Sequence, residues 1–215
     1  MIDSRLPSFP ARPIHGPRLD TAAGRGVLDP LLYGDRASEP KWNGFRLLFD
    51  RVDFIPWNRH GGILDSSQDV YQALQWLHDL PNSFPRYVDC EMLSRRHGFM
   101  KGCLIVLDYI GLGPQSMHRP QPYDLRRKHM EEHIELFEPT KHLLQTNTVC
   151  LTPSVPLENT LLYWDWVKEF NATIGASGLN SFFEGVVLKQ LDSPYPTQRI
   201  SPERETPLWT KHRFV

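Results

Sequence analysis

One stretch of the sequence stands out, because it places a lysine just before a tight turn that leads into a strand: Glu39-Pro40-Lys41-Trp42-Asn43-Gly44-Phe45-Arg46-Leu47-Leu48-Phe49. Residues 45–49 predict this strand, and residues 52–57 predict its neighbour after a turn. A lysine held by such rigid backbone can project into a cleft. Because a surface lysine on a β-turn has the same pattern, the rest of the chain must decide its role.

The remaining sequence mixes strands and helices without regular alternation. We expect strands over 87–93, 104–110, 148–153, 182–190 and 208–215, and helices over 69–80, 123–137 and 157–170. Residues 192–207, rich in proline and serine, predict a surface loop. The lack of regular β-α-β units predicts an α+β fold with antiparallel sheets rather than a doubly wound fold.

The composition is that of a folded protein. The chain has 215 residues, of which 40% are hydrophobic and 23% charged, and this excludes a disordered or fibrous chain. No apolar run of about 18 residues exists, so we expect no membrane association. Three cysteines without metal-ligand spacing, and an N-terminus unlike a signal peptide, predict a reducing, cytoplasmic location.

The charge of the chain is balanced overall but uneven locally. The net charge of −1 gives no general attraction to polyanions, so a nucleic-acid contact needs a local basic patch. Residues 1–34 are rich in proline and glycine and predict an arm packed on a domain that spans 35–215. Residues 1–38 are also basic, which makes this part of the chain either a solvated surface arm or a contact for a polyanion; its basic residues include Arg12, Arg18, Arg25 and Arg36.

Charged side chains recur at the ends of the predicted strands. In chain order they are Arg59, Asp89, Glu91, Glu184, Lys189, Lys211 and Arg213. Lys211 and Arg213 alternate along one strand and therefore share a face. Asp108 lies within an apolar strand, where a carboxylate without a partner would be costly. Each charge alone fits an ordinary strand end, whereas their conjunction in this order indicates a shared site.

In this order the residues resemble the motifs of the covalent lysine nucleotidyltransferases, which include ATP-dependent polynucleotide ligases and mRNA capping enzymes. EPKWNGFR (39–46) looks like the first motif, Arg59 with Gly61 like the second, and Asp89-Cys90-Glu91 like the third. FEGVVLK (183–189) and WTKHR (209–213) look like the fourth and fifth. The resemblance covers residues 35–215 and is greatest to the adenylation domain of bacterial ATP-dependent DNA ligases.

The resemblance implies a fold, a nucleophile and a set of ligands. It implies an α+β, ATP-grasp-like domain with two antiparallel β-sheets flanked by helices and ATP between the sheets. Lys41 would form lysyl-AMP, and Glu91 and Glu184 would bind Mg²⁺ or Mn²⁺. AMP would pass to a 5′-phosphate of nicked or broken duplex DNA, in DNA repair, replication or recombination. The nucleotide would contact Glu39, Arg46, Arg59, Glu91, Leu107, Lys189, Lys211 and Arg213.

The sequence departs from the family pattern at several places. Asn43 stands where the family usually has Asp, and Arg213 stands where it usually has Lys. Leu107 replaces an aromatic residue that stacks on the base in many relatives, and regular alternation would put Tyr109 on the same strand face. No OB domain follows the fifth motif in this sequence, so a separate OB-fold or DNA-end-binding protein is an expected partner.

Three functions fit these motifs. An ATP-dependent DNA ligase agrees best with the conjunction of EPKWNGFR and EGVVLK. An RNA ligase or a GTP-dependent capping enzyme is the enzymatic alternative, and labelling of Lys41 with AMP or GMP would separate a ligase from a capping enzyme. A catalytically weak nick-binding module is the third possibility, although such a module has no need of the nucleophilic lysine.

Overall fold

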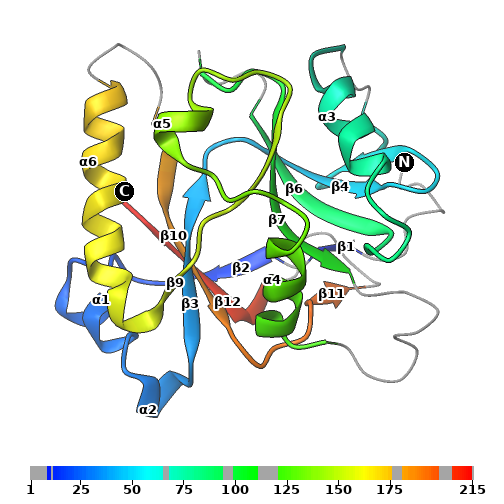
Figure 1. The fold of residues 1–215 in the computed structure, drawn as a ribbon. Coiled ribbons are helices and arrows are strands. Elements are labelled where there is room, and N and C mark those ends of the chain that lie inside the picture. Colours follow the sequence, from blue (N-terminus) through cyan, green and yellow to red (C-terminus); the bar gives the residue numbers. More distant parts are fainter. Residues whose placement is uncertain are drawn as a thin grey trace.

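The computed structural model describes residues 9–10, 12–64, 68–93, 99–110, 121–175, 181–198 and 205–214. Two five-stranded sheets form the framework (Figure 1). The β3 sheet has the order β2 (Arg12–His15), β12 (Glu205–Arg213), β10 (Phe183–Gln190), β3 (Arg36–Trp42) and β9 (Val155–Pro156). The β6 sheet has the order β5 (Ile55–Asn58), β4 (Phe45–Asp50), β6 (Tyr87–Leu93), β7 (Cys103–Ile110) and β8 (Val149–Leu151).

The pairing confirms the expected α+β class with two sheets. Most neighbouring strands are antiparallel, but each sheet also contains one parallel pair, β2 with β12 and β7 with β8. Two short strands, β1 (Phe9–Pro10) and β11 (Thr197–Gln198), pair separately. Among the described residues, no helix combines the length and the apolar character needed to cross a bilayer.

Helices cover the outer faces of the two sheets. α6 packs on β10 and β3, and Figure 1 shows it beside these strands on the left of the molecule. α3 and α4 pack on β7 of the other sheet. The helices are α1 (Ala22–Gly26), α2 (Pro30–Tyr33), α3 (Gln68–His78), α4 (Tyr123–Glu131), α5 (Pro139–His142) and α6 (Thr160–Gly175), with a 3₁₀ turn over Leu157–Asn159.

Apolar side chains fill the space behind and between the sheets. Leu47, Val88 and Val106 of the β6 sheet pack against Leu74 of α3 in one core cluster. Alternate residues of the same strands point the other way, so that Leu48 packs with Trp209 of β12. The two sheets therefore face one another, and the charged strand ends of the sequence meet between them.

The local structure differs from the expectation in two segments and adds detail in a third. The helix predicted over 123–137 ends at Glu131, because the following segment joins the sheet: Phe137 N donates to Leu151 O and Leu151 N donates to Glu135 O. The region of the predicted arm contains β2 and two short helices, and its Leu19 lies in the core. The loop predicted over 192–207 contains β11 and the first residues of β12, while residues 199–204 lie outside the described part.

Candidate active site

A glycine brings the candidate nucleophile and its neighbours together. Gly185 of β10 lies between Lys41 of β3 and Arg213 of β12 in the sheet register. Its φ is +150°, and an added Cβ would lie 1.9 Å from the carbonyl oxygen of His212. Only glycine therefore allows β10 and β12 to approach so closely here.

A bulge at Glu184 turns its carboxylate towards the lysine. The register between β10 and β3 shifts between Phe183 and Gly185, so Glu184 is the extra residue. Glu184 Oε2 accepts from Lys41 Nζ and forms an ion pair with Arg213 Nη2 at 3.2 Å. The Lys41 side chain remains 19% exposed, so a ligand can reach the amine.

The turn after Lys41 is fixed from both sides. Gly44 N donates to Glu91 Oε1 at 2.9 Å, and a Cβ on Gly44 would lie 2.6 Å from the carbonyl oxygen of Met92. Asn43 Nδ2 donates to Ser181 O at 2.8 Å, a bond that an aspartate could not donate. The departure from the family pattern at this position therefore has a structural use in this chain.

Glu91 lies in a poorly hydrated position beside several charges. Burial raises the pKa of Glu91 to about 7, although the positive charges of Lys41 and Arg46 and the Gly44 N–H favour its ionised form. Asp89 raises the pKa further by like-charge repulsion. Glu91 can therefore change its charge near neutral pH.

These residues surround one cavity of about 580 Å³, a size typical of a small-molecule site. Strands of both sheets contribute to its wall. The structure brings all ten predicted site residues to this wall: Glu39, Lys41, Arg46, Arg59, Glu91, Leu107, Glu184, Lys189, Lys211 and Arg213. Their chemical roles stay predictions.

Positive charge is concentrated around Lys211. Burial lowers the pKa of Lys211, and the positive charges of Arg213 and Lys41 lower it further. Glu205, whose Oε1 lies 3.7 Å from Lys211 Nζ, opposes this shift. Lys41, Lys211 and Arg213 are therefore close enough to act together on an anion.

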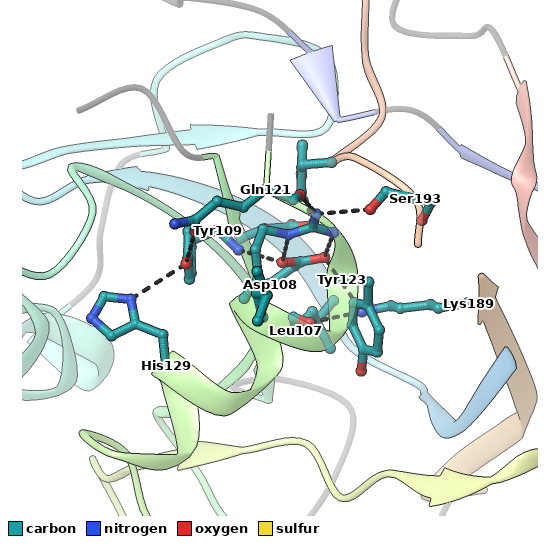
Figure 2. Close-up of polar contacts among 12 residues, drawn as sticks. Leu107, Asp108, Tyr109, Gln121, Tyr123, His129, Lys189 and Ser193 are labelled. Atoms are coloured by element: carbon teal, nitrogen blue, oxygen red, sulfur yellow. Dashed lines mark hydrogen bonds and ion pairs between the residues drawn. The ribbon is translucent and has the colours of Figure 1, made fainter. Parts of the chain in front are cut away.

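Two of the predicted nucleotide ligands pair with each other. Lys189 Nζ lies 2.9 Å from Glu39 Oε2 and donates to the carbonyl oxygen of Leu107 at 2.7 Å. The Tyr123 hydroxyl donates to the other oxygen of Glu39, and Figure 2 shows the Tyr123 ring beside Lys189. Glu39 and Lys189 are both almost fully buried, so their pairing compensates the burial of two charges.

The buried carboxylate of Asp108 also has a partner. Arg126 Nε and Nη2 donate to its two oxygens at 2.8 and 2.9 Å, and Tyr109 N donates to Oδ1 at 2.9 Å (Figure 2). Lys189 Nζ lies 3.9 Å from Asp108 and links this pair to Glu39. The sequence indicated that a buried Asp108 needs a partner, but it did not identify Arg126 of α4 as that partner.

The strand face of Tyr109 differs from the expectation. Pairing between β6 and β7 shifts between Cys90, opposite Val106, and Asp89, opposite Asp108, so Leu107 is an extra residue. Leu107 consequently lines the cavity, whereas Tyr109 is buried in the core on the α3 side. The expectation that the two residues share a face is wrong, because one bulged residue reverses the alternation.

Arg46 and Arg59, both predicted to contact the nucleotide, differ in their surroundings. Arg46 donates to both oxygens of the buried Asp89 at 3.0 and 2.7 Å, and the Tyr195 hydroxyl donates to the same carboxylate. Arg59 is exposed, and its Nε donates to His60 Nε2 at 3.0 Å. Arg46 is therefore held in place within the wall, whereas Arg59 lies at the mouth.

Several residues of the cavity wall, among them Arg12, Pro13 and Trp209, were not among the predicted site residues. Arg12 and Pro13 reach it because β2 pairs in parallel with β12, a pairing for which the sequence carries no local signal. Trp209 could have been found, because it shares its strand face with Lys211 and Arg213.

A divalent ion would meet two carboxylates in this cavity. Among the described residues, no group of three or more His, Cys, Asp or Glu side chains could hold a metal ion. Mg²⁺ is commonly held by one or two carboxylates together with substrate phosphates and water. Glu91 and Glu184 therefore fit an ion that arrives with a triphosphate. The three cysteines are free and buried.

Family models and curated protein sequences give no match to this chain. Solved structures do match. The ligase domain of Mycobacterium tuberculosis LigD has a TM-score of 0.53 and 18% identity, covering 96% of this chain and 59% of that one. A mycobacterial DNA ligase D complexed with ATP has a TM-score of 0.52 and 18% identity, covering 96% and 60%. The Chlorella virus DNA ligase-adenylate has a TM-score of 0.51 and 16% identity, covering 94% and 69%.

Across the matched structures, this chain spans about half to two thirds of the other chain's length. Their low sequence identity makes the shared property one of fold. The chain has the α+β fold of the adenylation domain of ATP-dependent DNA ligases.

Proposed function

We propose that this chain is the adenylation domain of an ATP-dependent DNA ligase, with Lys41 as its nucleophile. One observation carries the proposal: Lys41 lines a cavity of nucleotide size together with Glu91, Glu184 and the cations Lys211 and Arg213. This set supplies a nucleophile and charges for a phosphoryl group, the components that transfer of a nucleotide requires.

In the first step, Lys41 Nζ attacks the α-phosphorus of ATP. The new N–P bond replaces the P–O bond to pyrophosphate, which leaves with the electron pair of that bond. Nζ must lose its proton for this attack, and Glu184 is the carboxylate in contact with it. A divalent ion held by Glu184 and Glu91 would neutralise charge on the phosphates.

Lys211 and Arg213 bind the phosphates in this proposal. Both line the cavity beside Lys41, and their positive charge would balance the charge that builds up during transfer. The paired Glu39 and Lys189 and the side chain of Leu107 provide the opposite part of the wall for the base. The nucleotide is held by groups that the fold has already positioned.

AMP then passes from Lys41 to a DNA 5′-phosphate, and a 3′-hydroxyl displaces AMP to form the phosphodiester bond. The proposed acceptor is nicked or broken duplex DNA, because the solved structures described above are DNA ligases. A separate OB-fold protein or DNA-end-binding protein remains a proposed partner. The effect of such a partner can be measured by adding it to a reaction in which the chain seals nicked DNA.

Intact-protein mass spectrometry after incubation with ATP and Mg²⁺ tests the first step. We expect one AMP adduct per chain, located on Lys41 by peptide mapping, and none on the Lys41→Ala variant, because no other side chain replaces the amine. Lys128→Ala, which removes an exposed lysine outside the cavity, is the matched control and should label fully.

Each alternative gives a different result. A GMP adduct with GTP would assign the chain to capping chemistry. An AMP adduct that transfers to nicked RNA but not to nicked DNA would make it an RNA ligase. Absence of any adduct on a folded protein would refute the enzymatic proposal and leave a binding module.

A further inference from the structure

An arginine outside the ligase-like motifs lines the candidate active site. β2 runs parallel to β12, with Arg12 opposite Glu205 and His15 opposite Lys211. Arg12 and Pro13 consequently form part of the wall of the cavity that holds Lys41. The N-terminal segment therefore contributes a cation to a site otherwise formed by residues 39–213.

Arg12 differs from Lys41, Lys211 and Arg213 because it has no carboxylate partner among the residues that the structure describes. Lys41 and Arg213 pair with Glu184, and Lys211 pairs with Glu205. Within the described part of the chain, no ion pair involves Arg12, even though Glu205 is its strand neighbour. A guanidinium in this condition keeps its planar set of donors for an incoming anion.

Arg59, at another part of the cavity wall, likewise has no carboxylate partner among the described residues. It follows β5, and the ion pairs among the described residues do not include it. Trp209 and Leu208 of β12 pack in one cluster with Ile55 and Trp57 of β5. Because β2 is the edge strand beyond β12 and β5 is the edge strand of the other sheet, Arg12 and Arg59 stand at corresponding edges.

The potential around β2 is positive. Burial lowers the pKa of His15, and the positive charges of Lys211, Arg213 and Lys41 lower it further, while Glu205 raises it. Three cations of the cavity therefore act on a residue that is three positions from Arg12. A dianionic phosphate approaching along this edge would be attracted towards Lys41.

We propose that Arg12, opposite Arg59, binds the terminal 5′-phosphate of the DNA strand that receives AMP. The inference rests on the proposed function, because it assigns a substrate group to that same site. A phosphate held between the two arginines would present an oxygen to the AMP phosphorus on Lys41. That oxygen forms the new bond as the N–P bond breaks and Nζ regains a proton.

Binding of two nicked duplexes to the protein that already carries AMP tests this role. One duplex has a 5′-phosphate at the nick and the other a 5′-hydroxyl. We expect wild type to prefer the 5′-phosphate, and Arg12→Ala to lose about tenfold in affinity for that duplex alone. Arg12→Lys keeps the charge without the planar fork, and we expect it to retain part of the preference.

Arg25→Ala removes an exposed arginine of α1 from the same segment and should leave the preference unchanged. AMP transfer to the 5′-phosphate should fall much more in Arg12→Ala than formation of lysyl-AMP from ATP. An unchanged preference for the 5′-phosphate in Arg12→Ala would overturn the inference. Weakened ATP binding would overturn it as well, because Arg12 would then serve the triphosphate.

The experiment distinguishes failure of the proposed ligase function from failure of the proposed role of Arg12. If wild type forms no lysyl-AMP, the ligase assignment fails before Arg12 is tested. If wild type forms lysyl-AMP and transfers it, only the comparison of Arg12 variants decides the role of this residue. Thermal melting of each variant shows whether β2 remains paired with β12.

Discussion

Replacing Asp108 with Asn should destabilise the fold strongly, because it breaks a fully buried ion pair. Asp108 and Arg126 are 0% and 1% exposed, and two N–H groups of Arg126 donate to the two carboxylate oxygens. In Asp108→Asn, the Arg126 charge remains buried with neutral acceptors alone, which are the side-chain oxygen of the new Asn and the carbonyl oxygens of Gln121 and Ser193. Removing one partner of such a pair costs about 3–5 kcal/mol of the free energy of unfolding.

Urea denaturation followed by circular dichroism measures this loss, and the melting temperature should fall by about 10 °C. Asp20→Asn is the matched control, because Asp20 also accepts two bonds from one arginine, Arg18, but at the exposed surface. Solvent screens that pair, and its loss should matter far less. If Asp108→Asn and Asp20→Asn lowered the free energy of unfolding equally, burial would not explain the stabilising effect of the Asp108–Arg126 pair.

Two further predictions concern the cavity. Because burial raises the pKa of Glu91 to about 7 from an ordinary 4.5, the folded state binds more protons than the unfolded state across this window. The free energy of unfolding should therefore fall as pH rises from about 4.5 to 7 and then level off, and Glu91→Gln should remove this component. Identical pH slopes in both proteins would contradict the assignment. Leu107→Phe places an aromatic ring in the cavity wall, and we expect it to tighten ATP binding several-fold, since a stacked pair contributes about 0.5–1.5 kcal/mol. Calorimetric titration checks this, and an unchanged affinity would show that another residue covers the base.

Local patterns predicted the strands of the β6 sheet well. The strand expected over 87–93 is β6 with the same bounds, and the one expected over 104–110 is β7 with one more residue. Both segments are rich in apolar residues that pack in the core, so their sequence and their tertiary surroundings favour the same structure. The helix expected over 123–137 fails where Leu136 bridges to Leu151, because sheet pairing outweighs helical periodicity there.

Residue types at strand ends predicted which side chains line the cavity, but not how those side chains pair. The Glu39–Lys189 and Arg46–Asp89 ion pairs join residues that are about 150 and about 40 positions apart, and no local pattern encodes them. No local pattern in the sequence predicts the bulge at Leu107 either. This bulge makes Leu107, and not Tyr109, line the cavity. A sequence indicates chemistry by residue type and order, whereas tertiary contacts decide which charges are free to act.

The strand order of the two sheets has a consequence for the route of folding. β4, β5, β6 and β7 pair with partners close in the chain, whereas β2 and β12 pair across about 200 residues. Closing the longer loop costs about 1 kcal/mol more than closing the loop between β4 and β6. Contacts of long range form late, so the β6 sheet is expected to assemble first and the pairing of β2 with β12 last. Lys211, Arg213 and Arg12 lie on these two strands. The part of the cavity wall that carries Arg12, Lys211 and Arg213 is then the last to fold. Amide protons of β2 should therefore exchange with solvent before those of β6.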